Sequence, residues 1–180
     1  MAIRISKLED EQENLNLYSR RDCLEFHGIP ETPDENTDEL VKQIADLMAV
    51  EINPTDISTS HRLPSRRGII PTIIAKFARR STRDKLYNSK GNLKNRSSSD
   101  LGFVRSDNKL YVNESLTPKA RELYHQVRQV RKAHRFKYAW TKYGKPYLKK
   151  DNASRAISFA LLKELDDFKA SIPTLSGQVP

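Results

Sequence analysis

The sequence has little of what most extracellular, membrane or redox proteins require. Its 180 residues contain one cysteine, Cys23, which excludes an internal disulfide and a cluster of metal-binding thiolates. No apolar run exceeds a short stretch such as residues 157–162, so no segment is expected to cross a bilayer. The charged start MAIRISKLED lacks the pattern of a signal peptide. These absences predict a soluble intracellular protein that makes no membrane contact.

Enzyme motifs are missing as well. The chain has no Gly-rich phosphate loop, no H-E-x-x-H, no G-x-S-x-G and no clustered carboxylate motif. His27 and His61 fit strand positions better than a catalytic pair. We therefore expect a protein that is not an enzyme and that needs neither a cofactor nor a metal.

Positive charge is concentrated in the middle of the chain. Residues 1–59 carry a net charge of −9, residues 60–150 carry +19, and residues 151–180 carry −1, within an overall charge of +9. Such segregation is the electrostatic pattern of a protein that binds a polyanion. Solvated lysine and arginine faces would account for the same charges, and the sequence leaves that alternative open.

The basic segment contains a predicted β-hairpin over residues 136–150, FKYAWTKYGKPYLKK, with a turn at Tyr143-Gly144. A two-residue loop would place Trp140 opposite Tyr147 and mix lysines with aromatics on one face. A three-residue loop, Lys142 to Gly144, separates the two kinds of residue, and we expect that register. It would bury Phe136, Tyr138, Trp140 and Leu148, and expose Lys137, Lys145, Tyr147 and Lys149.

At the N-terminus, Ile5, Leu8, Gln12 and Leu15 have heptad spacing among charged residues. Residues 1–21 are therefore interpreted as the end of a coiled-coil helix. Two heptads are too short to associate alone, and a frayed amphipathic helix fits the pattern equally well.

Residues 22–114 predict the order strand, helix, strand, strand, helix, strand, which is the ferredoxin-like arrangement of RNA-recognition motifs. Asn36 with Glu39, and Ser81 with Asp84, are the expected helix caps. Strands are expected at residues 22–27, 57–63, 72–78 and 110–112, with residues 91–108 as a loop. The residues expected to face the helices are Leu24, Phe26, Ile57, Leu63, Ile73, Phe77, Leu110 and Val112. The open sheet face would then carry Glu25, His27, Ser60, Arg62, Thr72, Ile74, Lys76 and Tyr111.

Residues 115–170 predict a small helix, hairpin, helix domain. Thr117 and Pro118 form a helix start, and an apolar stripe follows at Ala120, Leu123, Tyr124, Val127 and Val130. After the hairpin, Asn152 or Ser154 should cap a last helix with Ile157, Leu161, Leu165 and Phe168 on its buried side. Residues 171–180 are expected to be a mobile tail. The fold class predicted for the chain is thus α+β, with this domain following the RNA-recognition-motif-like one.

Five segments together resemble the first open-reading-frame protein of LINE-type non-LTR retrotransposons, and the same core is similar to the baculovirus few-polyhedra (FP) protein. They are RRDCLEFHGIPE, SHRLP, PTIIAKFARRSTRDKLY, LYVNESLTPKARELY and KYAWTKYGKPYLKK, within a resemblance that spans residues 8–168. It implies a coiled coil for self-association, a divergent RNA-recognition motif and a C-terminal domain. It also implies single-stranded RNA and DNA binding as a chaperone that packages a cytoplasmic or nuclear ribonucleoprotein. The alternative is an FP-like adaptor that binds proteins through the same fold.

The candidate nucleic-acid-binding residues are basic or aromatic side chains of the positive segment. Arg62 is expected to project from the open sheet face, where it could contact a phosphate or a base. The full set is Arg62, Arg66, Arg67, Lys76, Arg79, Arg80, Arg83, Tyr111, Arg128, Arg131, Lys132, Arg135, Lys137, Lys145, Tyr147 and Lys149.

Overall fold

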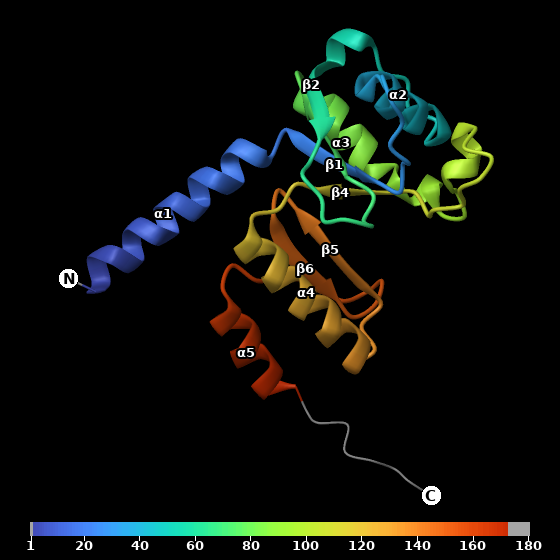
Figure 1. Cartoon of the computed structure of the whole chain (residues 1–180). Coiled ribbons are helices and arrows are strands. Elements are labelled where there is room, and N and C mark those ends of the chain that lie inside the picture. The colour runs from blue at the N-terminus through green and yellow to red at the C-terminus, as the bar shows by residue number, and fades with distance from the viewer. Residues whose placement is uncertain (1, 173–180) are drawn as a thin grey trace, which may run out of the picture. The chain divides into compact units, whose positions relative to one another are not determined.

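The computed structural model describes residues 2–172 and has a mixed α+β fold, as predicted (Figure 1). The chain divides into two compact units. The central unit is Ser19–Ser115, and the C-terminal unit joins the chain from Leu116 onward to the N-terminal helix up to Tyr18. Each unit has its own hydrophobic core, and each is described by itself below.

The central unit is built on a four-stranded antiparallel sheet with the strand order β2-β3-β1-β4. Two helices, α2 (Thr37–Leu47) and α3 (Arg80–Asn88), pack on one face of this sheet. The strands are β1 (Cys23–His27), β2 (Ile57–Arg62), β3 (Ile73–Phe77) and β4 (Tyr111–Glu114). The predicted order of strands and helices is therefore confirmed for this part of the chain.

The core of the central unit follows from alternation along the strands. Leu24 and Phe26 of β1 are buried together with Ile73 and Ala75, their partners across β3. Helix α2 begins as predicted, because the Asn36 side chain accepts a hydrogen bond from the backbone N–H of Glu39. The buried side of α2 is centred on Val41, Ile44 and Ala45, with Leu40 and Leu47 partly buried beside it.

A β-bulge in β2 reverses part of the predicted sheet. Ile57 lies opposite Phe77, but the register shifts by one residue before Thr59, which lies opposite Lys76. Because one extra residue exchanges the two faces of a strand, Ser60 and Arg62 point toward the helices. The prediction that Ser60 and Arg62 lie on the open face, with Leu63 buried opposite them, is therefore wrong.

Two further boundaries differ from prediction in this unit. Helix α3 begins at Arg80 after Arg79, so Ser81 lies inside the helix and is not its cap. The expected loop over residues 91–108 contains two short 3₁₀ helices, η2 (Lys90–Leu93) and η3 (Ser98–Leu101). A third, η1 (Pro54–Asp56), leads into β2.

The C-terminal unit is organised around α4 (Pro118–Ala133), which lies across β5 (Tyr138–Lys142) and β6 (Lys145–Lys149) (Figure 1). As predicted, Thr117 is the N-cap, and its hydroxyl accepts a hydrogen bond from the Ala120 N–H at 3.1 Å. Leu123, Val127 and Val130 are buried against Leu148 of β6, and Tyr124 is partly buried beside them.

The hairpin has a two-residue loop, so the predicted three-residue register is wrong. Lys142 pairs with Lys145 and Trp140 pairs with Tyr147, which leaves Tyr143 and Gly144 as the turn. Both turn residues have positive φ angles, 51° and 81°, as a type I′ turn requires. Gly144 also lies against helix α1, where an added Cβ would come within 2.5 Å of Leu17.

The last part of the unit also departs from prediction. Residues 157–158 form β7 (Ile157–Ser158), which pairs with β6, and helix α5 (Leu162–Ser171) begins later than expected. Asn152 and Ser154 therefore do not cap a helix. Residues 173–180 of the tail expected at 171–180 lie outside the described residues.

Helix α1 (Ala2–Arg20) is continuous over the residues expected to end a coiled coil. Three of its four heptad positions, Ile5, Leu8 and Leu15, are exposed apolar residues. Its other side reaches the start of α4, where Glu13 accepts a hydrogen bond from the Thr117 hydroxyl and Asp10 lies 3.3 Å from Lys119.

Candidate nucleic-acid interface

The hairpin register gathers aromatic and basic residues on the side of β5 and β6 that faces away from α4. We call this surface the outer hairpin face. Thr141, Pro146 and Leu148 point the other way and are buried. Because side chains alternate along a strand, the residues between them share one side. The outer hairpin face consists of Tyr138, Trp140, Lys142, Lys145, Tyr147 and Lys149.

The aromatic residues of this face are ordered by cross-strand stacking. The Trp140 and Tyr147 rings have centroids 5.4 Å apart and planes 11° apart. Tyr138 lies beside Trp140 on the same strand and directly opposite Lys149. Each ring keeps part of its surface exposed, so a flat ligand has access to it.

Lysines lie at both ends of the aromatic group. Lys142 and Lys145 face each other next to the turn and are exposed, and Lys149 lies at the other end in a half-buried position. The face therefore combines ring surfaces with cations that a phosphate backbone can approach. It contains Lys145, Tyr147 and Lys149 from the predicted set, whereas Lys137 precedes β5.

A hollow of about 490 Å³ lies at the Tyr138 end of the outer hairpin face, and Tyr138, Ala139, Trp140, Lys149 and Asn152 line it. The Oδ1 atom of Asn152 accepts two hydrogen bonds, from the Tyr138 hydroxyl at 2.6 Å and from Lys137 Nζ at 3.1 Å. These bonds fix the Asn152 amide at the edge of the hollow.

The predicted basic residues of α4, together with Arg135 just after its end, lie outside the core of the C-terminal unit. Arg128, Lys132 and Arg135 are exposed, and Arg131 is half-buried. Arg128 lies 6.0 Å from the centroid of the Tyr124 ring. These side chains add positive charge to the same unit as the outer hairpin face, on a different element.

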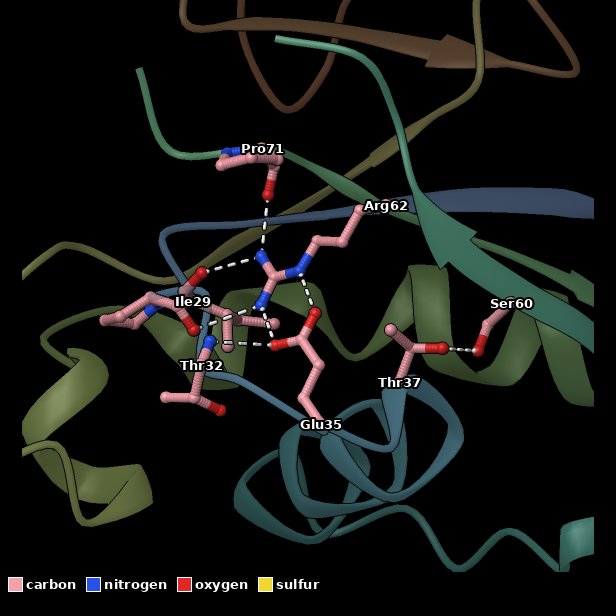
Figure 2. A network of polar contacts seen from close by, with 8 residues as sticks. Ile29, Thr32, Glu35, Thr37, Ser60, Arg62 and Pro71 are labelled. Carbon is pink, nitrogen blue, oxygen red and sulfur yellow. Dashed lines mark hydrogen bonds and ion pairs between the residues drawn. The ribbon is translucent and has the colours of Figure 1, made fainter. Parts of the chain in front are cut away.

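Arg62 is held inside the central unit (Figure 2). Its side chain is only 11% exposed and forms a two-pronged ion pair with Glu35, with N···O distances of 2.7 and 2.8 Å. Its other N–H groups donate to the carbonyls of Ile29, Pro30 and Pro71 at 2.7–3.0 Å. All five guanidinium N–H groups are thus used internally.

This network corrects the interpretation of Arg62 as an exposed binding residue. The bulge turns the side chain toward α2, where Glu35 and three loop carbonyls bind it (Figure 2). The Arg62 hydrogen bond is the main reason why the pKa of Glu35 lies below its ordinary value of 4.5. Arg62 ties together the β1–α2 loop, the end of β2 and the loop before β3.

Arg83 is also an internal residue. Its side chain is 2% exposed, and its Nη2 donates to Glu114 at 2.6 Å, with Asp84 3.1 Å from Nη1. A guanidinium at this depth cannot reach a phosphate at the surface, so its predicted contact with nucleic acid does not fit the structure. Sequence reasoning missed this pair because the acidic partner lies 31 residues further along the chain.

The remaining predicted residues of the central unit occupy separate surfaces. Tyr111 and Lys76 are exposed on the open sheet face, where Tyr111 stacks on His27 with ring centroids 4.5 Å apart. Arg66 and Arg67 lie in the exposed loop between β2 and β3. Arg79 and Arg80 lie at the start of α3, and Arg80 forms an ion pair with Asp22 at 3.1 Å.

Sequence reasoning missed four residues of the candidate interface. The expected register buries Tyr138 and Trp140 and puts Lys142 in the loop, and Asn152 is expected only as a helix cap. The alternation of Tyr138, Trp140 and Lys142 along one strand could have indicated a shared face. Nothing in the sequence predicts the hydrogen bonds of Asn152.

Within residues 2–172 the structure shows no group of three or more His, Cys, Asp and Glu side chains that could hold a metal ion. In the same described part of the chain, no helix is both long and apolar enough to span a membrane.

Comparison with known families places one part of the chain. Residues 117–169 match the family model described as baculovirus FP protein domain 2. The match runs from the N-cap of α4 into α5 and so includes the outer hairpin face and Asn152. It supports the FP relation inferred from the sequence and gives no support to the LINE-type assignment. No curated protein matches the chain.

Proposed function

We propose that this protein binds single-stranded nucleic acid, RNA or DNA, with little sequence preference, through the outer hairpin face. The observation that carries the proposal is the placement of Tyr138, Trp140 and Tyr147 on one surface with Lys142, Lys145 and Lys149. Single-strand binders combine aromatic rings, on which bases stack, with cations that follow the phosphates. The exposed arginines of α4 extend the positive charge available to a longer strand.

The same surface supports a role in annealing and exchanging strands. Stacking accepts every base, since each base has a π-face, and it requires bases that are not paired within a duplex. A protein with these properties favours open strands and leaves them able to pair with a new partner. We propose on this basis the activity of a nucleic-acid chaperone that packages a ribonucleoprotein. The LINE-type origin of that particle rests on the sequence resemblance alone.

We also propose that the central unit is a divergent RNA-recognition motif with a ferredoxin-like topology. The strand order β2-β3-β1-β4, with both helices on one face, supports that topology. Its open face carries Glu25 and Ile74 on the two middle strands, where RNA-recognition motifs place stacking aromatics. We therefore assign it an electrostatic contribution from Arg66, Arg67 and Lys76, with Tyr111 as its exposed ring.

Self-association is part of the proposal, through a longer coiled coil of which α1 forms the end. Ile5, Leu8 and Leu15 recur at heptad spacing on the exposed side of this helix. A coiled coil would place several outer hairpin faces on one strand and raise the avidity for nucleic acid.

A salt titration tests the proposed function. We expect the logarithm of affinity for a labelled single strand to fall with the logarithm of salt, at a slope of about −0.7 for each phosphate neutralised. Replacing Lys142, Lys145 and Lys149 by alanine should make the slope shallower by about 2 in total. The control variant replaces Lys85, Lys94 and Lys109, three exposed lysines of the central unit, and should keep most of the original slope. Equal losses in both variants, or a flat salt response of the original protein, would contradict the proposal.

The alternative is an FP-like adaptor that binds a protein through the C-terminal unit, the part of the chain that matches the FP family model. An adaptor has no need for salt-dependent affinity for single strands. The titration therefore separates the two functions, because an adaptor would show weak binding that the lysine substitutions do not change.

A further inference from the structure

We infer that the hollow beside Trp140 is a subsite for one nucleobase, and that Asn152 makes it prefer cytosine or guanine to adenine. This inference rests on the proposed function, since it concerns the same outer hairpin face. It adds a modest base preference to binding that is otherwise electrostatic.

The lining of the hollow suits a base attached to its phosphate. The rings of Tyr138 and Trp140 offer apolar surface on which a base can stack, and Lys149 lies in the same lining. With a volume of about 490 Å³, the hollow falls within the range of ordinary small-ligand sites. Tyr138 is held in place by its hydroxyl bond to Asn152 and by Lys137 Nζ, which lies 5.2 Å from its ring centroid.

The orientation of the Asn152 amide follows from its partners. Lys137 carries an ammonium, which can only donate hydrogen bonds, so the atom it contacts must be the amide oxygen. The Tyr138 hydroxyl donates to the same oxygen. The amide nitrogen makes no hydrogen bond within residues 2–172, and its two N–H groups remain available to a ligand.

An asparagine fixed in this way can donate hydrogen bonds to a base but cannot accept them. Asparagine usually recognises adenine by using both amide atoms, the oxygen for N6–H and the nitrogen for N7. Here the oxygen of Asn152 is already occupied by Tyr138 and Lys137, so it cannot accept from N6–H. Cytosine presents O2 next to N3, and guanine presents O6 next to N7, and both pairs of atoms accept hydrogen bonds. Adenine has no edge with two adjacent acceptors, and its amino group would face the amide N–H groups.

The test compares affinities of the full chain for twelve-nucleotide (dC) and (dA) strands at one salt concentration. For each protein we take the ratio of its (dC) affinity to its (dA) affinity. We expect this ratio to be about fivefold higher in the original protein than in an Asn152→Ala variant, as one net hydrogen bond would give. Within one protein, the ratio of the two affinities cancels changes in overall binding. Comparing this ratio between the original protein and the variant also cancels the self-stacking of adenines, which is the same in both measurements. Asn14→Ala, at an exposed asparagine of α1, is the matched control and should keep the original ratio.

A second variant tests whether the orientation of the Asn152 amide, and not only its presence, determines the base preference. Lys137→Met with Tyr138→Phe removes both donors to Asn152 Oδ1 and leaves the amide in the chain. We expect this double variant to lose the discrimination against adenine, because the freed oxygen can accept from N6–H.

The outcomes distinguish the subsite from the general function. An unchanged (dC) to (dA) ratio in Asn152→Ala, or full discrimination in the double variant, would overturn the subsite and leave the proposed function intact. Binding that is absent from the original protein, or that does not depend on salt, would overturn the proposed function and the subsite with it.

Discussion

Trp140 and Tyr147 lie opposite each other on the two strands of the hairpin, with ring centroids 5.4 Å apart and planes nearly parallel. This pairing requires an even-numbered loop, which here has two residues, since any odd loop length would place the two rings on opposite faces. The pair lies on the side away from α4, while Leu148 fills the core on the other side. The division into a packing face and the proposed binding face depends on this single register.

Arg62→Ala should lower the stability of the central unit. It should change nucleic-acid binding only through this loss of stability. The substitution leaves Glu35 without its cation and removes the donors to three carbonyls. Breaking a buried ion pair by removing one partner costs about 3 kcal/mol or more in the free energy of unfolding. Chemical denaturation measures this loss directly.

Arg66→Ala is the matched control for Arg62→Ala, because Arg66 lies in the exposed loop that follows β2. It should leave the free energy of unfolding within about 0.5 kcal/mol of the original value. Arg62→Lys should not restore stability, since an ammonium cannot form the two-pronged pair with Glu35. Normal stability of Arg62→Ala would contradict the structural role.

The stability of the central unit should depend on the titration of Glu35 in acid. The pKa of Glu35 is lowered, first by the Arg62 hydrogen bond and further by the Thr32 N–H and the Arg62 charge, against partial desolvation that raises it. A lowered pKa contributes stability that is fully present above about pH 4.5 and is lost as the pH falls through the folded-state pKa.

Glu35→Gln should therefore lower the melting temperature at pH 7 and reduce its dependence on pH below about 4.5. Glu51→Gln, at an exposed carboxylate, is the control and should follow the original curve. If the melting temperatures of Glu35→Gln and the original protein fall in parallel from pH 7 to pH 3, the ionisation of Glu35 does not contribute to stability.

Gly144→Ala should destabilise the C-terminal unit for two separable reasons. Gly144 has a φ angle of 81°, which costs a residue with a side chain about 1 kcal/mol or more, and an added Cβ would meet Leu17 at 2.5 Å. Combining Gly144→Ala with Leu17→Ala removes the steric conflict and should recover part of the loss. Gly91→Ala is the control, since an added Cβ there meets no atom within 4 Å. Equal melting temperatures for both alanine variants would refute the tight turn.

Much of the central unit could be predicted, because its buried residues alternate regularly. Leu24 and Phe26 of β1, and Ile73 and Phe77 of β3, are all buried as expected. The bulge in β2 could not be predicted from Ile57 and Leu63, which have the same parity in the sequence although the register shifts between them. Because of the one extra residue in the bulge, Arg62 lies in an internal network and not on the open face.

The hairpin shows a different limit of sequence reasoning. The expected register separates the aromatic and apolar residues from the lysines, which is the rule for a hairpin with one buried face and one solvated face. The outer hairpin face violates that rule, since Trp140 and Tyr147 keep exposed surface next to lysines. Similarly, the spacing of Ile157 and Leu161 fits a helix, but residues 157–158 complete a sheet beside β6. Short strands carry too few residues to show their period.

The most direct test of the nucleic-acid interface compares Trp140→Ala with Leu148→Ala, one substitution on each face of the hairpin. For both variants, thermal melting and affinity for a labelled single strand are measured on the same preparation. We expect Trp140→Ala to cost about 1 kcal/mol of stability or less, as loss of a cross-strand pair does, and to weaken binding by about 1–3 kcal/mol. Leu148, which is fully buried, should cost about 2–5 kcal/mol of stability when it is replaced by alanine. If Trp140→Ala instead melts early and still binds normally when folded, the outer hairpin face is not the interface.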